Sequence, residues 1–137
     1  MPRPVTPPVA VDVIIELADR PGRPVVLIKR RNPPHGYALP GGFVDLGERV
    51  EDAARREALE ETGLEIELRS LLGVYSDPGR DPRGHTVSIV YVAEARGRPQ
   101  AGDDASRVFE AQPGSPPPLV FDHDRVLRDY LERFRQG

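Results

Sequence analysis

The chain of 137 residues contains no cysteine and no tryptophan, and Lys29 is its one lysine. Without cysteine there is no disulfide, no thiol nucleophile and no zinc–thiolate site. The longest apolar runs, such as 25–28, are far too short to span a bilayer, and no apolar signal segment follows Met1. We therefore expect a cytoplasmic protein that does not contact membranes.

The charge balance is slightly acidic, with a formal net charge of -3. Electrostatic capture of nucleic acid needs a strong positive excess, so nucleic acid is not expected as a partner. A small anionic substrate held by a few local arginines is compatible with this balance. The length suits one domain. We expect an extended lead-in over residues 1–8, four of which are proline, and a single domain over 9–137.

Periodicity and composition predict a mixed sheet with helices on both faces, an α/β fold. Strands are expected at 9–17 and 25–30, paired as a hairpin, and at 66–75 and 86–95. Helices are expected over 48–61, ending at Gly63, and after Asp122, where an apolar stripe runs through 126–134. Residues 39–42 are expected as a loop, 111–118 as a linker, and the polar loop 76–85 as a functional segment.

Three carboxylates share one stripe at the end of the central helix: Glu57, Glu60 and Glu61, at i, i+3 and i+4. Like charges so spaced destabilise a helix by about 0.2–0.5 kcal/mol each, and anions at its C-terminus cost about 0.3–1 kcal/mol. A divalent cation would offset both effects, because carboxylate oxygens suit magnesium or manganese. The alternative is an ordinary solvated face with pairs such as Arg56–Glu60.

Residues 42–64 decide between these alternatives. They match the pattern Gly-x5-Glu-x7-Arg-Glu-U-x-Glu-Glu-x-Gly-U, where U is aliphatic, at every fixed position from Gly42 to Gly63. Ala58 is small for the first U position. The chain therefore resembles the Nudix hydrolases, whose signature this is.

The resemblance implies an α/β/α sandwich with a mixed sheet, in which the signature forms a loop–helix–loop. It also implies hydrolysis of a nucleoside diphosphate linked to another group, with Mg²⁺ as the cofactor and Mn²⁺ as a substitute. Glu57 and Glu61 are expected to bind metal most directly, and Glu60 directly or through water. The carbonyl of Gly41 is a further expected ligand.

The same resemblance assigns supporting and acid–base roles. Arg56 and Glu48 are expected in the catalytic site, where Arg56 orients the carboxylates through charge-assisted hydrogen bonds. The general base lies within the signature in some relatives and on a downstream loop in others. Asp103, Asp104 and Glu110 are the downstream candidates, with a simple turn as the alternative for the aspartate pair.

The loop 76–86 is similar to that of ADP-ribose pyrophosphatases, which carry a comparable Asp-Pro-Arg-Gly-His run. Arg80 and Arg83 are expected donors to phosphate or ribose oxygens, against the alternative of solvated charges paired with Asp77 and Asp81. His85 is expected to hold the loop rather than to act as an acid or base.

Gly42 and Tyr37 complete the expected substrate contacts. Tyr37 stands where many relatives have tryptophan, so base stacking would fall to Tyr37, Phe43, Tyr75 or Phe109.

These features predict magnesium-dependent cleavage of ADP-ribose to AMP and ribose 5-phosphate. Two alternatives stay open. One is a different nucleotide substrate for the same chemistry, such as a nucleotide sugar, NADH or an oxidised deoxynucleotide. The other is a sensor that binds ADP-ribose without cleaving it, although an intact carboxylate trio favours catalysis. A homodimer, in which a second copy completes the pocket, is also expected from the resemblance.

Overall fold

The computed structural model describes residues 2–102 and 105–135. Its elements follow one another along the chain as β1 (Val9–Leu17), β2 (Val25–Arg30), β3 (Tyr37–Ala38), β4 (Gly41–Phe43), α1 (Val50–Thr62), β5 (Glu67–Tyr75), β6 (Val87–Ala95), β7 (Ala105–Ala111) and α2 (His123–Phe134). The expected strands at 9–17 and 25–30 are confirmed at both ends. The other two expected strands each begin one residue later than predicted.

All described strands belong to one mixed sheet. Its main path runs β3-β2-β1-β6-β5, with β4 added to β1 and β7 added to β2. Strands β1 and β6 are parallel over their whole length, and the other pairs are antiparallel. The β-branched composition of β1 suits this central place, because the strand is covered on both faces.

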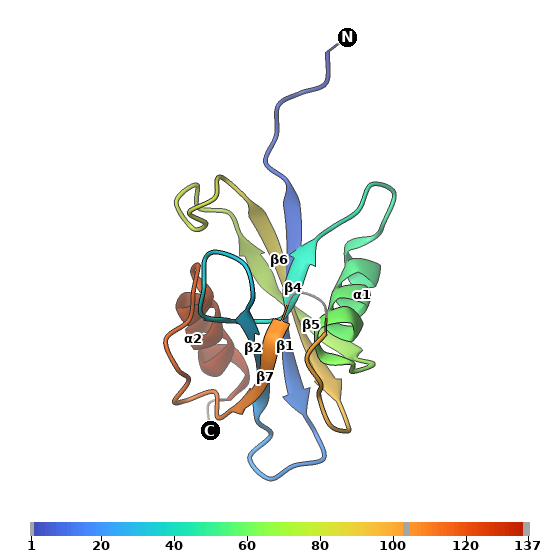
Figure 1. Cartoon of the computed structure of the whole chain (residues 1–137), viewed down its shortest axis with the longest axis vertical. Coiled ribbons are helices and arrows are strands. Elements are labelled where there is room, and N and C mark those ends of the chain that lie inside the picture. Colours follow the sequence, from blue (N-terminus) through green and yellow to red (C-terminus); the bar gives the residue numbers. More distant parts are fainter. Residues whose placement is uncertain (1, 103–104, 136–137) are drawn as a thin grey trace.

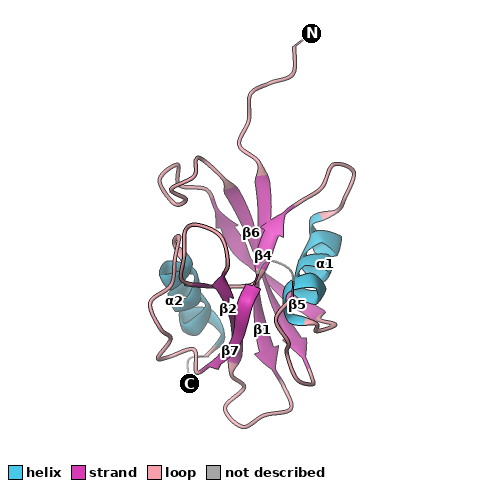
Figure 2. Cartoon of the chain, in the orientation of Figure 1, coloured by secondary structure: helices cyan, strands magenta, loops and turns pink. Residues whose placement is uncertain are grey.

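Side chains of β1 point alternately into two apolar layers. Ile14 packs with Tyr130 of α2 on one face. Val13 packs with Ala54 and Ala58 of α1 on the other. Figures 1 and 2 show the two helices on opposite sides of the sheet. The expected α/β/α sandwich is therefore confirmed.

Helix α1 ends as its sequence predicts. Gly63 adopts φ 71°, in the left-handed region, and its N–H donates to the carbonyl of Leu59 at 2.9 Å. This conformation favours glycine because other residues have a Cβ that clashes there. The N-terminus differs, since the helix begins at Val50 rather than at residue 48.

The loop expected at 39–42 is wrong for its second half. Gly41 and Gly42 lie in β4, which pairs with Asp12 and Val11 of β1. A Cβ at Gly41 would lie 2.2 Å from the carbonyl oxygen of Val11, so the two backbones can approach only with glycine there. Glycine has a low strand propensity, and this tertiary contact overrides it.

Strand β7 was not expected from the sequence either. It pairs with β2 from Val25↔Ala111 to Arg30↔Ala105. Residues 2–8 have no regular secondary structure and project from the sheet (Figure 1). Among the helices of the described residues, none has the length and apolarity needed to cross a membrane.

Replacing Gly63 with alanine should lower the free energy of unfolding by about 1–2 kcal/mol, because a Cβ would be held in the left-handed region. Urea denaturation of the full chain measures this. Gly114→Ala is the matched control, since Gly114 lies outside the left-handed region and a Cβ there would meet nothing within 4 Å. An equal loss in both variants would contradict the argument from backbone conformation.

Candidate active site

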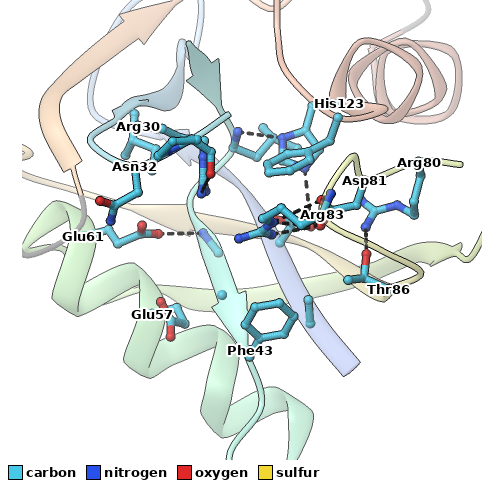
Figure 3. A pocket seen from close by; sticks show the side chains of 18 of the residues that line it. Arg30, Asn32, Phe43, Glu57, Glu61, Arg80, Asp81, Arg83, Thr86 and His123 are labelled. Atoms are coloured by element: carbon cyan, nitrogen blue, oxygen red, sulfur yellow. Dashed lines mark hydrogen bonds and ion pairs between the residues drawn. The ribbon is translucent and has the colours of Figure 1, made fainter. Parts of the chain in front are cut away.

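A pocket of about 410 Å³ opens where β1, β2 and β4 meet the last turns of α1, the loop 76–86 and the first turn of α2. Figure 3 shows its two ends. Glutamates of α1 form one end, and arginines, an aspartate and a histidine form the other. The ionisable residues that line it are Arg30, Asp12, Asp45, Glu57, Glu61, Arg80, Asp81, Arg83 and His123.

The acidic end is built by α1 against β4. Glu57 and Glu61 are 8% and 3% exposed, on the same helix face as the small residues that pack on the sheet. The Gly41 N–H donates to Oε1 of Glu61 at 2.7 Å. A Cβ at Gly42 would lie 2.4–2.6 Å from the carboxyl atoms of Glu57. The missing Cβ of Gly42 therefore lets the strand backbone approach Glu57, and the backbone N–H of Gly41 contacts Glu61 directly.

Glu60 lies on the solvent side of this arrangement. Its side chain is 43% exposed, and its carboxylate lies 3.3 Å from Nη1 of Arg56. Within residues 2–102 and 105–135, no three histidine, aspartate or glutamate side chains are gathered closely enough to form a metal site by themselves. The structure thus brings together two of the three expected carboxylates and places the third outside.

Arg56 links the helix to the preceding loop. Its Nε and Nη2 donate to the two carboxylate oxygens of Glu48 at 2.8 and 3.0 Å, and its Nη1 donates to Glu57 at 2.7 Å. Glu48 accepts these hydrogen bonds from Arg56 and another from the Asp45 N–H, and together they lower the pKa of Glu48 to about 2. The hydrogen bonds with Glu48 and Glu57 also raise the pKa of Arg56, and the bond with Glu48 has the largest effect. Such contacts suit the supporting roles predicted for Arg56 and Glu48.

Arg80 forms part of the pocket wall, but its donors are directed into the protein. Its Nε and Nη2 donate to Asp122 at 3.0 and 2.8 Å, and its Nη1 donates to Thr86 at 2.7 Å. The sequence suggested Asp77 or Asp81 as its alternative partner. The observed partner instead comes from the far end of the chain, beside the first turn of α2.

Arg83 is more open to the pocket than Arg80. Its Nη2 donates to Oδ2 of Asp81 at 2.9 Å, yet its side chain is 43% exposed. The guanidinium lies 5.5 Å from the ring centre of Phe43 and 5.2 Å from that of Phe121. His85 Nε2 is 3.0 Å from the carbonyl oxygen of Ser76, so this side chain bridges the two ends of its loop.

Two predicted site residues lie elsewhere. Tyr37 does not line the pocket, and its ring packs against Phe109 with centres 5.5 Å apart. Glu110 forms an ion pair with Arg20 at 2.9 Å, beside the β1–β2 turn. The aromatic rings that line the pocket are those of Phe43 and Phe121 instead.

The candidate bases Asp103 and Asp104 lie outside the described residues. The connection that leads to them does reach α1, because the Gly102 N–H donates to the carbonyl of Glu61 at 3.0 Å. Its described part therefore lies against the C-terminal end of the helix that carries the carboxylates.

Sequence reasoning missed a buried polar group behind the arginine-rich end. Asp12 accepts a hydrogen bond from Ser88 and lies 3.5 Å from Nε2 of His123. Burial opposes ionisation of Asp12, but His123, Ser88 and Arg80 outweigh it, so its pKa is lowered. The available signal was an aspartate inside the apolar run 11–15, since a charged residue in a buried strand needs partners.

Comparisons with known proteins agree with this geometry. The NUDIX domain family matches residues 6–130. An ADP-ribose pyrophosphatase of Methanocaldococcus jannaschii is 48% identical over 134 residues, which cover 96% of this chain and 76% of that protein.

Two solved structures share the fold. The NUDIX domain of Shewanella oneidensis NrtR, complexed with ADP ribose, matches with a TM-score of 0.82 at 27% identity, covering 94% of this chain and 89% of that one. A bifunctional NMN adenylyltransferase/ADP ribose pyrophosphatase of Francisella tularensis, complexed with AMP and a manganese ion, gives a TM-score of 0.79 at 27% identity. That match covers 93% of this chain and 42% of the bifunctional one, so this chain spans less than half its length.

The Glu48–Arg56 pair predicts a pH-dependent contribution to stability. The folded pKa of Glu48, about 2, is below its ordinary value of 4.5. The pair therefore stabilises the fold above pH 4.5, and this effect is lost as the pH falls toward 2. The Tm difference between wild type and Glu48→Gln should be largest at neutral pH and shrink on acidification. Glu65→Gln, at an exposed glutamate just after α1, is the control. A difference that grows at low pH would contradict the assignment.

Proposed function

The chain belongs to the NUDIX domain family, and we propose that it hydrolyses ADP-ribose to AMP and ribose 5-phosphate with the help of divalent cations. The observation that carries this proposal is the pair of buried carboxylates, Glu57 and Glu61, at the end of a pocket whose other end is rich in arginine. A diphosphate needs positive charge to approach carboxylates, and cations held by these carboxylates would provide it.

The donor groups suit Mg²⁺ or Mn²⁺. Both cations prefer oxygen ligands, and this end of the pocket offers the carboxylates of Glu57 and Glu61 beside the backbone of Gly41. Glu60, from the same helix turn, is the further candidate ligand. When bound at such a site, divalent cations neutralise phosphate oxygens and make water a better nucleophile.

Residues of the chain would then orient the carboxylates and accept the proton released in the reaction. Water adds to one phosphorus, the bond from that phosphorus to the bridging oxygen breaks, and the water proton goes to a carboxylate. The Gly41 N–H orients Glu61, and Arg56 orients Glu57. The candidate bases are the carboxylates of the signature and of residues 103 and 104. Glu110 is not retained as a candidate, because it forms an ion pair with Arg20 outside the pocket.

We assign substrate contacts outside the acidic end to Arg83, Phe43 and Phe121. Arg83 is partly exposed and lies at the pocket, so it can donate to phosphate or ribose oxygens. Phe43 is 42% exposed and offers a ring face for base stacking in place of Tyr37. The predicted homodimer stays a prediction.

The choice of ADP-ribose is supported by the similarity to the ADP-ribose pyrophosphatase of Methanocaldococcus jannaschii and by the ligand of the NrtR domain. The similarity to the ADP-ribose-bound NrtR domain is also compatible with a second function, in which ADP-ribose is bound but not cleaved. The two functions are separated by turnover, because a sensor binds the same ligand and releases it unchanged.

A substrate panel tests the proposed reaction. Purified protein with Mg²⁺ should give the highest kcat/KM on ADP-ribose, compared with NADH, nucleotide sugars, diadenosine polyphosphates and oxidised dGTP. Chromatography of the products should show AMP and ribose 5-phosphate. Binding of ADP-ribose without products would support the sensor function, and a higher kcat/KM on another nucleotide would replace the substrate while keeping the chemistry.

Glu61→Gln tests the assignment of the acidic end. Glutamine still offers an oxygen to the Gly41 N–H, so the fold should persist, but it removes one negative charge. Loss of several kcal/mol of transition-state stabilisation corresponds to a decrease in kcat/KM of about two orders of magnitude or more. Glu65→Gln makes the same chemical change on the surface and should leave kcat/KM unchanged. Wild-type turnover by Glu61→Gln would overturn the assignment.

A further inference from the structure

The segment 39–42, which carries the backbone of the acidic end, is anchored at both ends by side chains. At its C-terminal half, the Gly41 N–H donates to Glu61. At its start, the Leu39 N–H donates to Nδ1 of His123 at 3.0 Å. Between them, the carbonyl of Pro40 accepts from the Val13 N–H at 2.9 Å. The segment therefore cannot shift without breaking at least one of these bonds.

His123 is held in one orientation. Because Nδ1 accepts the Leu39 N–H, the ring hydrogen is on Nε2, which faces Oδ2 of Asp12 at 3.5 Å. His123 is 1% exposed and Asp12 is 8% exposed, so solvent has little access to these contacts. Figure 3 shows the ring of His123 in the wall of the pocket, with dashed lines for its interactions. A carboxylate behind an imidazole is a common way of fixing which ring nitrogen accepts.

The helix that carries His123 is also fixed at this point. The preceding residue, Asp122, accepts two hydrogen bonds from Arg80, and Arg80 in turn donates to Thr86. The first turn of α2 is thereby attached to the loop 76–86. His123 presents Nδ1 from a rigid base.

We propose that His123 is a positioning residue, oriented by Asp12, whose Nδ1 holds the segment 39–42 in place and so sets the backbone of the acidic end against Glu57 and Glu61. Its effect on turnover rests on the proposed metal-dependent hydrolysis. Its effect on the backbone does not. A group that supports metal-binding residues from behind typically alters metal affinity or activity by about 10–100-fold when removed.

Two substitutions distinguish the roles of the two ring nitrogens. In His123→Asn, the side-chain amide places its oxygen near the position of Nδ1, so it can still accept from Leu39. In His123→Gln, the amide reaches toward Asp12, and nothing remains at the Nδ1 position. We expect His123→Gln to weaken the binding of Mn²⁺ alone by about 10-fold or more, measured from the electron spin resonance of free Mn²⁺. His123→Asn should retain most of the wild-type affinity.

Tyr130→Phe is the control for a general loss of stability. Tyr130 is buried on the same helix, its hydroxyl donates to Glu16, and neither residue lines the pocket. The control should lower Tm but leave Mn²⁺ affinity unchanged. The proposal is overturned if His123→Gln binds Mn²⁺ as tightly as wild type, if both His123 variants lose affinity equally, or if the control loses as much.

A spectrum of the unmodified chain tests the orientation directly. Long-range ¹H–¹⁵N correlation at neutral pH reports which nitrogen of each histidine carries hydrogen, and the chain has three histidines to assign. His123 should show hydrogen on Nε2 and a bare Nδ1, and hydrogen on Nδ1 would refute the proposal even if no variant folds. Neither this spectrum nor Mn²⁺ binding uses substrate. If the chain binds Mn²⁺ but does not hydrolyse ADP-ribose, the proposed function is overturned and this inference is unaffected.

Discussion

The contact between the last turns of α1 and the backbone of β4 constrains the rest of the molecule. It buries two carboxylates, Glu57 and Glu61, where a strand backbone without side chains meets them. Removing charged groups from water costs several kcal/mol per ion, so this contact is poorly explained by stability alone. The small residues of α1 bring the helix close enough to the sheet, and pairing of β4 with the central strand fixes the other side.

Two separate networks balance the charges of the pocket. Arg56 joins Glu48 to Glu57 on the helix side, and Arg80 joins Asp122 to the opposite wall. Among the described residues, no buried side-chain nitrogen or oxygen lacks a hydrogen-bond partner. The walls of the pocket are therefore held by the protein's own contacts, which lowers the ordering needed when a ligand binds.

The parts of the molecule that local sequence determines were predictable. The strands β1 and β2 follow from β-branched runs, and Gly63 marks the end of α1 because one local conformation requires it. Strand β4 was not predictable, because Gly41 and Gly42 form a strand only when β1 lies beside them. At the substrate end, the sequence predicted Arg80 as a ligand donor, whereas its guanidinium donates to Asp122, which lies 42 residues away along the chain.

The two ends of the pocket differ in how much of the sequence builds them. The acidic end comes from one continuous stretch of sequence, so the signature alone argues for chemistry on a diphosphate. The opposite end combines β1, the loop 76–86 and the first turn of α2, and small changes in any of them alter what fits there. A shared fold therefore supports the reaction class more firmly than the identity of the nucleotide. In this chain, the buried pair Asp12 and His123 connects the two ends, because it lies in the wall of one and holds the backbone of the other.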